Sequence, residues 1–253
     1  MAILFSGDFH ANAKGEMEFI SENTLLEKYK EHLYKKINYH IILGDTGFLW
    51  PGNEDAEKLF FYELAKRPFP VLYVVGNHDP VLGLSDLPEV DIEIGEKVVL
   101  VNKENPFIAY LKRGKIYNIE NHKFLVLGGA LSIDKFYRVS GKSWWKQEYW
   151  SDDEKTDIFR LLKNENNFDY VLSHTGPSRI NRAINNVDSF YTPKFKDEVS
   201  VLNESIDGKI KCKQWFCGHW HKDVYYYDIN KKKGYQYLYQ QTALLDGDEI
   251  KVL

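Results

Sequence analysis

The sequence has 253 residues, 43% of them hydrophobic, which is enough to bury the core of one sizeable domain or of two small ones. The net charge of −4 gives no global basic field of the kind that attracts nucleic acid. Two cysteines, Cys212 and Cys217, make no disulfide framework, and no apolar run approaches the roughly 20 residues of a membrane span. We therefore expect a cytoplasmic protein that does not associate with membranes.

Short apolar runs, each followed at once by glycine or polar residues, recur along the chain. In chain order they are AILFS before GDFH, HIIL before GDTG, PVLYVV before GNHD, KFLVL before GGA, YVLS before HTGP, and WFC before GHWH. Continuous apolar runs of this length predict strands that are buried on both faces. Because no linker rich in Pro, Gly or Ser interrupts the series, we predict a single domain over residues 1–253.

Amphipathic helices are predicted between these strands, over residues 16–36, 54–66 and 151–165. The third begins with Ser151 and Glu154, at the spacing of a capping box. Beyond residue 223 the segments 224–229, 234–245 and 249–253 predict antiparallel strands and hairpins. The whole pattern indicates an α/β fold with mixed sheets, for which we favour two packed sheets flanked by helices.

The glycine-polar motifs are predicted to lie at carboxyl ends of strands, where open α/β sheets bind ligands. Asp8 and His10 are two residues apart, as are His219 and His221, so in extended chain each pair can face one cation. The candidate metal ligands are Asp8, His10, Asp45, Asn77, His174, His219 and His221. These are too many for one tetrahedral zinc ion and suit two metals that share a carboxylate. Mixed nitrogen and oxygen donors favour Mn, Fe, Ni, Co or Zn over Mg or Ca.

Taken in order, the motifs Asp-x-His, Gly-Asp, Gly-Asn-His-Asp, a lone His and Gly-His-x-His resemble the calcineurin-like metallophosphoesterase superfamily. The resemblance implies a four-layer α/β/β/α sandwich, with two mixed sheets flanked by helices. It also implies two divalent transition-metal ions, with manganese as the first choice. The first ion would be held by Asp8, His10 and His221, and the second by Asn77, His174 and His219. Asp45 would bridge the two.

The same resemblance gives His78 and Asp79 catalytic roles. A hydroxide bridging the metals would attack phosphorus, and His78 would contact the phosphate or the leaving group. Asp79 would orient His78, although it could instead be an N-cap or turn residue before Pro80.

The substrate class is predicted from what the motifs lack. Protein phosphatases of the superfamily carry arginines in GDxxDRG and RGNHE, whereas this chain has GDTGFLW and VGNHD. We therefore expect phosphodiesters or nucleotide-like substrates, with nucleic acid as a further candidate substrate. The alternatives are a phosphomonoesterase or protein phosphatase, a non-catalytic metal-binding scaffold, and a nucleic-acid-binding module.

Two further sets of residues have open roles. Arg138, Arg179 or Arg182 could replace the missing arginines, or each could be an ordinary surface charge. In the aromatic segment from Phe136 to Trp150, Trp144, Trp145, Tyr149 and Trp150 could stack on a base or sugar, or could form a small core cluster.

Overall fold

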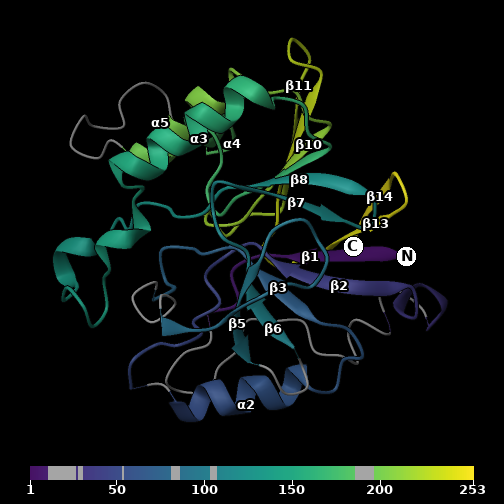
Figure 1. Ribbon diagram of the computed structural model, residues 1–253, viewed down its shortest axis with the longest axis vertical. Coiled ribbons are helices and arrows are strands. Elements are labelled where there is room, and N and C mark those ends of the chain that lie inside the picture. Colours follow the sequence, from purple (N-terminus) through teal and green to yellow (C-terminus); the bar gives the residue numbers. More distant parts are fainter. Residues whose placement is uncertain (11–26, 28–30, 53, 81–85, 103–106, 186–196) are drawn as a thin grey trace.

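The computed structural model describes residues 1–253 except 11–26, 28–30, 53, 81–85, 103–106 and 186–196. Two β-sheets pack face to face, with helices on their outer sides (Figure 1). The eight-stranded sheet has the order β14 (Glu249–Val252), β13 (Ala243–Asp246), β1 (Ala2–Ser6), β2 (Ile37–Ile42), β3 (Val71–Tyr73), β6 (Ile108–Tyr110), β5 (Val98–Asn102), β4 (Glu89–Val90). The six-stranded sheet has the order β11 (Val224–Asp228), β12 (Lys233–Tyr237), β10 (Gln214–Cys217), β9 (Tyr170–Leu172), β8 (His122–Val126), β7 (Lys115–Ile119).

Both sheets are mixed, and their centres are parallel. Strands β1, β2, β3 and β6 pair in parallel in one sheet, as do β8, β9, β10 and β12 in the other. Parallel neighbours end at the same edge of a sheet, so the loops after these strands lie together.

A continuous apolar core lies between the sheets. Phe5 of β1 stacks on Phe216 of β10 with ring centroids 4.4 Å apart, and Phe124, Tyr170 and Leu172 extend this layer. The sandwich architecture expected from the resemblance is therefore confirmed.

Helices cover the outer faces (Figure 1). Helix α2 (Glu54–Leu64) lies on the side of the eight-stranded sheet. Helices α3 (Asp152–Asn164), α4 (Ser178–Ile184) and α5 (Glu198–Asp207) cover the six-stranded sheet, where Ile158, Ile180 and Ile206 pack on its outer side chains. Ser151 and Glu154 form the predicted capping box of α3. Most of the helix predicted over residues 16–36 lies outside the described residues.

The C-terminal segments form the expected antiparallel pairs, β11 with β12 and β13 with β14. The pairs belong to different sheets, because the chain crosses from one sheet to the other between Tyr237 and Ala243. Strands β4 to β7 were not predicted. Within the described part of the chain, no helix has the length and apolar character needed to cross a membrane.

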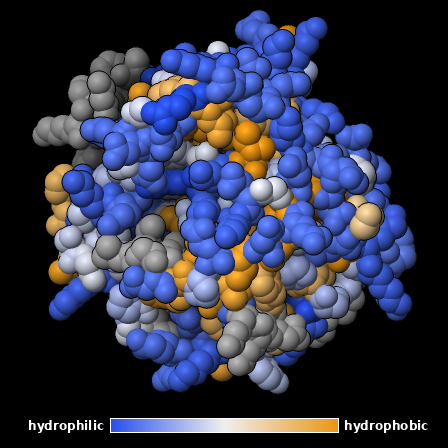
Figure 2. All heavy atoms as spheres, in the orientation of Figure 1, coloured by the Kyte–Doolittle hydropathy of each residue, from blue (hydrophilic) through white to orange (hydrophobic). Residues whose placement is uncertain are grey.

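Hydrophilic residues cover most of the face seen in Figure 2. Several large hydrophobic side chains are nevertheless exposed within one short stretch of chain, which contains Ile133, Phe136, Tyr137 and Val139. This stretch includes the short 3₁₀ helix η2 (Lys135–Tyr137), and a second one, η3 (Lys146–Glu148), follows it.

Candidate active site

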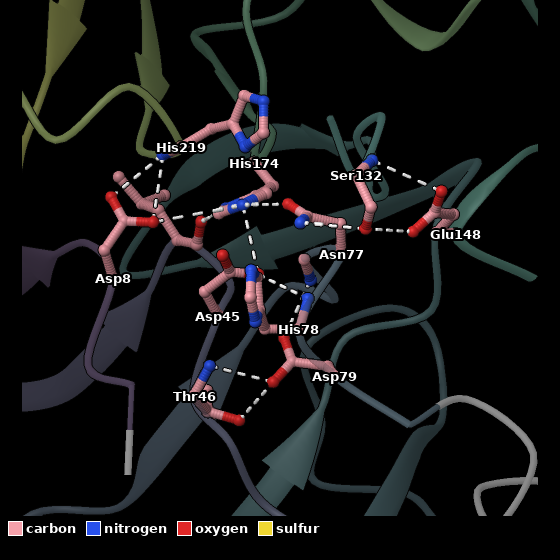
Figure 3. Close-up of polar contacts among 12 residues, drawn as sticks. Asp8, Asp45, Thr46, Asn77, His78, Asp79, Ser132, Glu148, His174 and His219 are labelled. Carbon is pink, nitrogen blue, oxygen red and sulfur yellow. Dashed lines mark hydrogen bonds and ion pairs between the residues drawn. The ribbon is translucent and has the colours of Figure 1, made fainter. Parts of the chain in front are cut away.

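The seven predicted ligands come together from the loops that follow five parallel strands. Asp8 and His10 follow β1, Asp45 follows β2, Asn77 follows β3, His174 follows β9, and His219 and His221 follow β10. Figure 3 shows Asp8, Asp45, Asn77, His174 and His219 converging with His78 at one place. The edge where the strands end thus brings together residues that are up to 213 positions apart in the sequence.

One group of possible metal ligands consists of Asp8, His10 and His221, whose ligand atoms lie within 4.8 Å of one another. The Nε2 atoms of His10 and His221 are 2.8 Å apart. Asp8 is fully buried and accepts the backbone N–H of His219 on both carboxylate oxygens, at 3.0 and 2.9 Å. These are the residues that the resemblance gives to the first metal.

A second group consists of Asp45, His174 and His219, also within 4.8 Å. His174 Nε2 lies 3.2 Å from Asp45 Oδ1 and 3.1 Å from Asn77 Oδ1. Its other nitrogen, Nδ1, donates to the carbonyl oxygen of Leu43 at 2.7 Å. A bond of this kind fixes the ring and directs Nε2 toward the other ligands.

Asp45 lies between the two groups. Its Oδ1 is next to His174, whereas its Oδ2 lies 3.9 Å from His10 Nε2. The two oxygens of one carboxylate thus face ligands of different groups. A third group, His10, Asp45 and His78, joins the other two.

The electrostatics of the site suit cations. Burial raises the pKa of Asp8 to about 8, so a cation beside this carboxylate would favour its charged form. Burial lowers the pKa of His10 to about 4 and that of His219 to about 3, so both rings are neutral, which is the form that binds metals. His174 differs: burial alone would lower its pKa, but Asp45, Asp8 and the bond to Leu43 together raise it to about 9, so this imidazole must release a proton when it binds a metal. The donors therefore fit divalent transition metals.

The backbone at the site is strained. Asp8, His10, Asp45, His219 and His221 all have positive φ, between 44° and 72°. The expectation that Asp8 with His10, and His219 with His221, each face one cation from extended chain is therefore wrong in its geometry. Asp8 and His10 do meet in one group, whereas His219 and His221 fall in different groups. Positive φ is uncommon for residues other than glycine and collects at functional sites.

Close packing of the loops explains two of the motif glycines. A Cβ at Gly44 would lie 2.4 Å from His174 Nδ1, and a Cβ at Gly76 would lie 2.1 Å from Asp45 Oδ1. Neither position has room for a side chain, because a proposed ligand fills the space.

His78 lies at the side of the two groups. Its backbone N–H donates to Asp45 Oδ1 at 2.8 Å, and its ring stacks on Trp50 with centroids 6.2 Å apart. Arg138 Nη2 lies 2.8 Å from His78 Nε2. Burial, partly offset by Asp45, lowers the pKa of His78.

Asp79 has other partners than the expected His78 ring. Its Oδ1 accepts the backbone N–H and the hydroxyl of Thr46 and the N–H of Gly47, and its Oδ2 accepts the N–H of Gly76. Asp79 thus ties the loop after β2 to the loop after β3 (Figure 3), and any influence on His78 passes through the backbone.

Of the three candidate arginines, Arg138 reaches the site. Arg179 instead forms ion pairs with Glu204, Asp207 and Asp228, and Arg182 is exposed on α4.

The aromatic segment is largely structural. Trp150 is 4% exposed, packs on α3 and donates its ring N–H to the carbonyl of Gly128. Trp145 is 3% exposed and packs against Trp50, whereas Trp144 and Tyr149 are partly exposed beside Lys135. Of the two roles considered for the aromatic segment, Trp145 and Trp150 therefore have the one in the core.

Several supporting residues were not predicted. Ser132 Oγ accepts the side-chain N–H of Asn77 at 3.2 Å and donates to the buried carboxylate of Glu148 at 2.5 Å (Figure 3). Tyr239 stacks on His221 at 4.5 Å with the rings almost parallel. A carboxylate within an aromatic segment, as at Glu148, is the one local signal that could have drawn attention to these contacts.

Comparisons with known proteins bear on the family and the fold. A family model described as calcineurin-like phosphoesterase matches residues 1–223. No curated protein sequence matches the chain. One solved structure, 12% identical, aligns with a TM-score of 0.57 over 100% of this chain and 98% of its own. A putative 5′-nucleotidase from Staphylococcus aureus, 14% identical, aligns with a TM-score of 0.50 over 100% of this chain and 52% of its own.

At these identities the two structures show a shared fold, and this chain spans about half the length of the nucleotidase. The family model covers most of the chain and includes every proposed ligand. The chain belongs to the calcineurin-like phosphoesterase family.

Proposed function

We propose that this protein hydrolyses phosphate esters at a centre of two divalent transition metals, and that it acts on phosphodiesters or nucleotide-like substrates. The observation that carries the proposal is the position of Asp45, whose two carboxylate oxygens face His174 and His10 of separate ligand groups. The proposal includes a single catalytic domain over residues 1–253 acting in the cytoplasm, as the sequence predicts.

Asp8, His10 and His221 would hold one ion, Asn77, His174 and His219 the other, and Asp45 both. When bound, two such ions supply hydroxide at neutral pH and neutralise phosphoryl oxygens. Manganese is the first choice, with Fe, Zn, Ni and Co as alternatives, because neutral imidazoles and carboxylates suit these metals.

His78 would donate its ring N–H to the oxygen that leaves phosphorus. Its backbone bond to Asp45 and its stacking on Trp50 hold the ring beside the ligands. Burial lowers the pKa of His78, so the ring would stabilise the departing oxygen by a hydrogen bond and not by transfer of a full proton. Asp79 would act by keeping the loops that carry Asp45 and His78 in register.

A preference for diesters is supported by the absence of both motif arginines. A diester carries one negative charge at the reacting group and a monoester nearly two, so a site with fewer cations discriminates less against the diester. The contact between Arg138 and His78 favours a second candidate, a phosphomonoesterase, because it brings one cation to the site.

The test compares kcat/KM for a nitrophenyl phosphate monoester and a matched diester at the same pH, with Mn²⁺ supplied. We expect turnover of both, with the diester at least equal. A monoester preference above tenfold, about 1.4 kcal/mol in transition-state binding, would establish the second candidate instead.

The same experiment tests the non-catalytic alternatives. If none of Mn, Fe, Zn, Ni and Co supports turnover while metals still bind, the protein is a scaffold. Salt-dependent binding of DNA without turnover would indicate a nucleic-acid-binding module.

A further inference from the structure

Arg138 is a largely buried cation held in a fixed direction. The side chain is 9% exposed, and its Nε forms an ion pair with Asp134 Oδ1 at 2.8 Å. Its Nη1 donates to the carbonyl oxygen of Ser143 at 3.3 Å. These two contacts leave Nη2 to face His78, at 2.8 Å from Nε2 and 3.4 Å from Nδ1.

The burial of this charged side chain needs a physical explanation. A guanidinium keeps its charge at every accessible pH, so burying one is unfavourable unless its N–H groups are bonded. Asp134 is half exposed and could pair with an arginine in solvent equally well. A purely structural role would not require the third N–H group to point at a proposed catalytic ring.

Hydrogen bonds and aromatic packing hold the segment around Arg138 in place. Arg113 donates to the carbonyl oxygens of Gln147 and Tyr149 and forms an ion pair with Glu154, which fixes the end of the segment to α3. Trp145 packs edge-on against Trp50 at 4.8 Å, and Trp50 stacks on His78. His78 is therefore bordered by Arg138, which belongs to this segment, and by Trp50, which packs against it.

We propose that Arg138, supplied by the segment between β8 and α3, binds a non-bridging oxygen of the substrate phosphate and sets the balance between monoesters and diesters. This inference rests on the proposed hydrolysis of phosphate esters. A guanidinium N–H forms a strong, charge-assisted hydrogen bond to a phosphate oxygen, and the anchoring of Arg138 by Asp134 reduces the ordering that binding requires. Because a monoester carries the larger charge, Arg138 should contribute more to monoester binding than to diester binding. Asp134 is then a positioning residue.

The test measures binding of inorganic phosphate to the Mn²⁺-loaded protein by calorimetry, together with kcat/KM for the nitrophenyl monoester and diester. For Arg138→Ala we expect phosphate affinity and monoester kcat/KM to fall by roughly 10- to 100-fold, in line with losing a charged hydrogen bond. Diester kcat/KM should fall less, and manganese stoichiometry should not change.

Three further variants separate phosphate binding from structure. Arg138→Lys keeps the charge but loses the planar guanidinium that Asp134 and Ser143 orient, so it should recover part of the phosphate affinity. Asp134→Asn should weaken phosphate binding by less than Arg138→Ala. Arg160→Ala removes an exposed arginine of α3 and should behave as wild type.

The inference is overturned if Arg138→Ala binds phosphate within twofold of wild type. It is also overturned if Arg138→Ala, Arg138→Lys and Asp134→Asn lower monoester and diester activity equally and lower the melting temperature in parallel, because that is the pattern of a structural tie. A wild-type protein that binds phosphate but turns over neither ester would refute the proposed function, while the phosphate-binding comparison would still decide the role of Arg138.

Discussion

Replacing Glu148 by glutamine is expected to weaken one of the two proposed metal sites, although Glu148 touches no metal ligand directly. Glu148 is 2% exposed and accepts the hydroxyl of Ser132, which in turn accepts the side-chain N–H of Asn77. This direction of donation turns the Asn77 amide so that Oδ1 faces His174. Glutamine can present an NH₂ group to Ser132, and the amide of Asn77 then loses its fixed orientation.

The loss of metal affinity can be estimated from the two hydrogen bonds that connect Glu148 to Asn77 through Ser132. The bond of 2.5 Å between Ser132 and Glu148 joins a hydroxyl to a carboxylate, and bonds to charged groups contribute ~1.5–3 kcal/mol. Loss of a group that orients a ligand typically lowers metal affinity by about 10- to 100-fold. We expect Glu148→Gln to fall in that range, with Ser132→Ala changing affinity in the same direction.

The assay is a calorimetric titration of metal-free protein with Mn²⁺. Wild type should bind two equivalents, and Glu148→Gln should weaken one of them while leaving the other unchanged. Glu249→Gln, on the exposed strand β14, is the matched control. Unchanged binding at both sites, or equal weakening of both, would refute the role of the hydrogen bonds from Glu148 through Ser132 to Asn77.

Other predictions follow from the same geometry. Asp45→Asn should reduce manganese stoichiometry below two by elemental analysis, and a wild type saturating at one with Asp45→Asn unchanged would exclude a shared carboxylate. His78→Asn should keep the metals and lower kcat by about 10²–10⁴ on a poor leaving group, where an unchanged kcat would exclude a role of His78 at the leaving oxygen. Asp207→Asn should lower the free energy of unfolding, measured with urea, by roughly 3–5 kcal/mol, because Asp207 pairs with the buried Lys233. Burial would raise the pKa of Asp207, but Lys233 and Lys231 lower it below the ordinary value, so its stabilisation is present at neutral pH and is lost as pH falls through the lowered pKa. Below about pH 4 the free energy of unfolding of the variant should therefore fall less steeply with pH than that of wild type, and equal slopes would contradict this. Removing metal with a chelator should lower the melting temperature, because the ions bind only the folded site, and an unchanged temperature would argue against them.

The sequence was sufficient for the central strands and for the motifs that follow them. A parallel strand covered on both faces must be apolar throughout, so AILFS and PVLYVV stand out from the surrounding chain. The edge strands gave no such signal. Strand β4 has two residues, and β7 alternates between exposed and buried positions among polar neighbours. Their position depends on pairing with other strands, which a local pattern does not contain.

The contacts that complete the site could not be predicted for a related reason. Arg138 meets His78 across 60 residues, and Glu148 acts on Asn77 through Ser132. Neither contact follows from spacing, because the path of the segment between β8 and α3 depends on its anchors, Arg113 and Trp150. Trp150, considered for stacking on substrate, proved to be such an anchor.

The strained backbone at the proposed metal ligands links the fold to the proposed function most directly. Positive φ costs ~1–3 kcal/mol per residue, with Asp and His toward the lower end, so five such residues carry strain comparable to a substantial part of a domain's stability. The loops sustain this strain because they hold one another. The N–H of His10 donates to the carbonyl of Asp45 at 2.8 Å, and the N–H of His219 donates to Asp8. A change in one loop therefore loosens ligands in the next, so substitutions at separate ligands should not be additive.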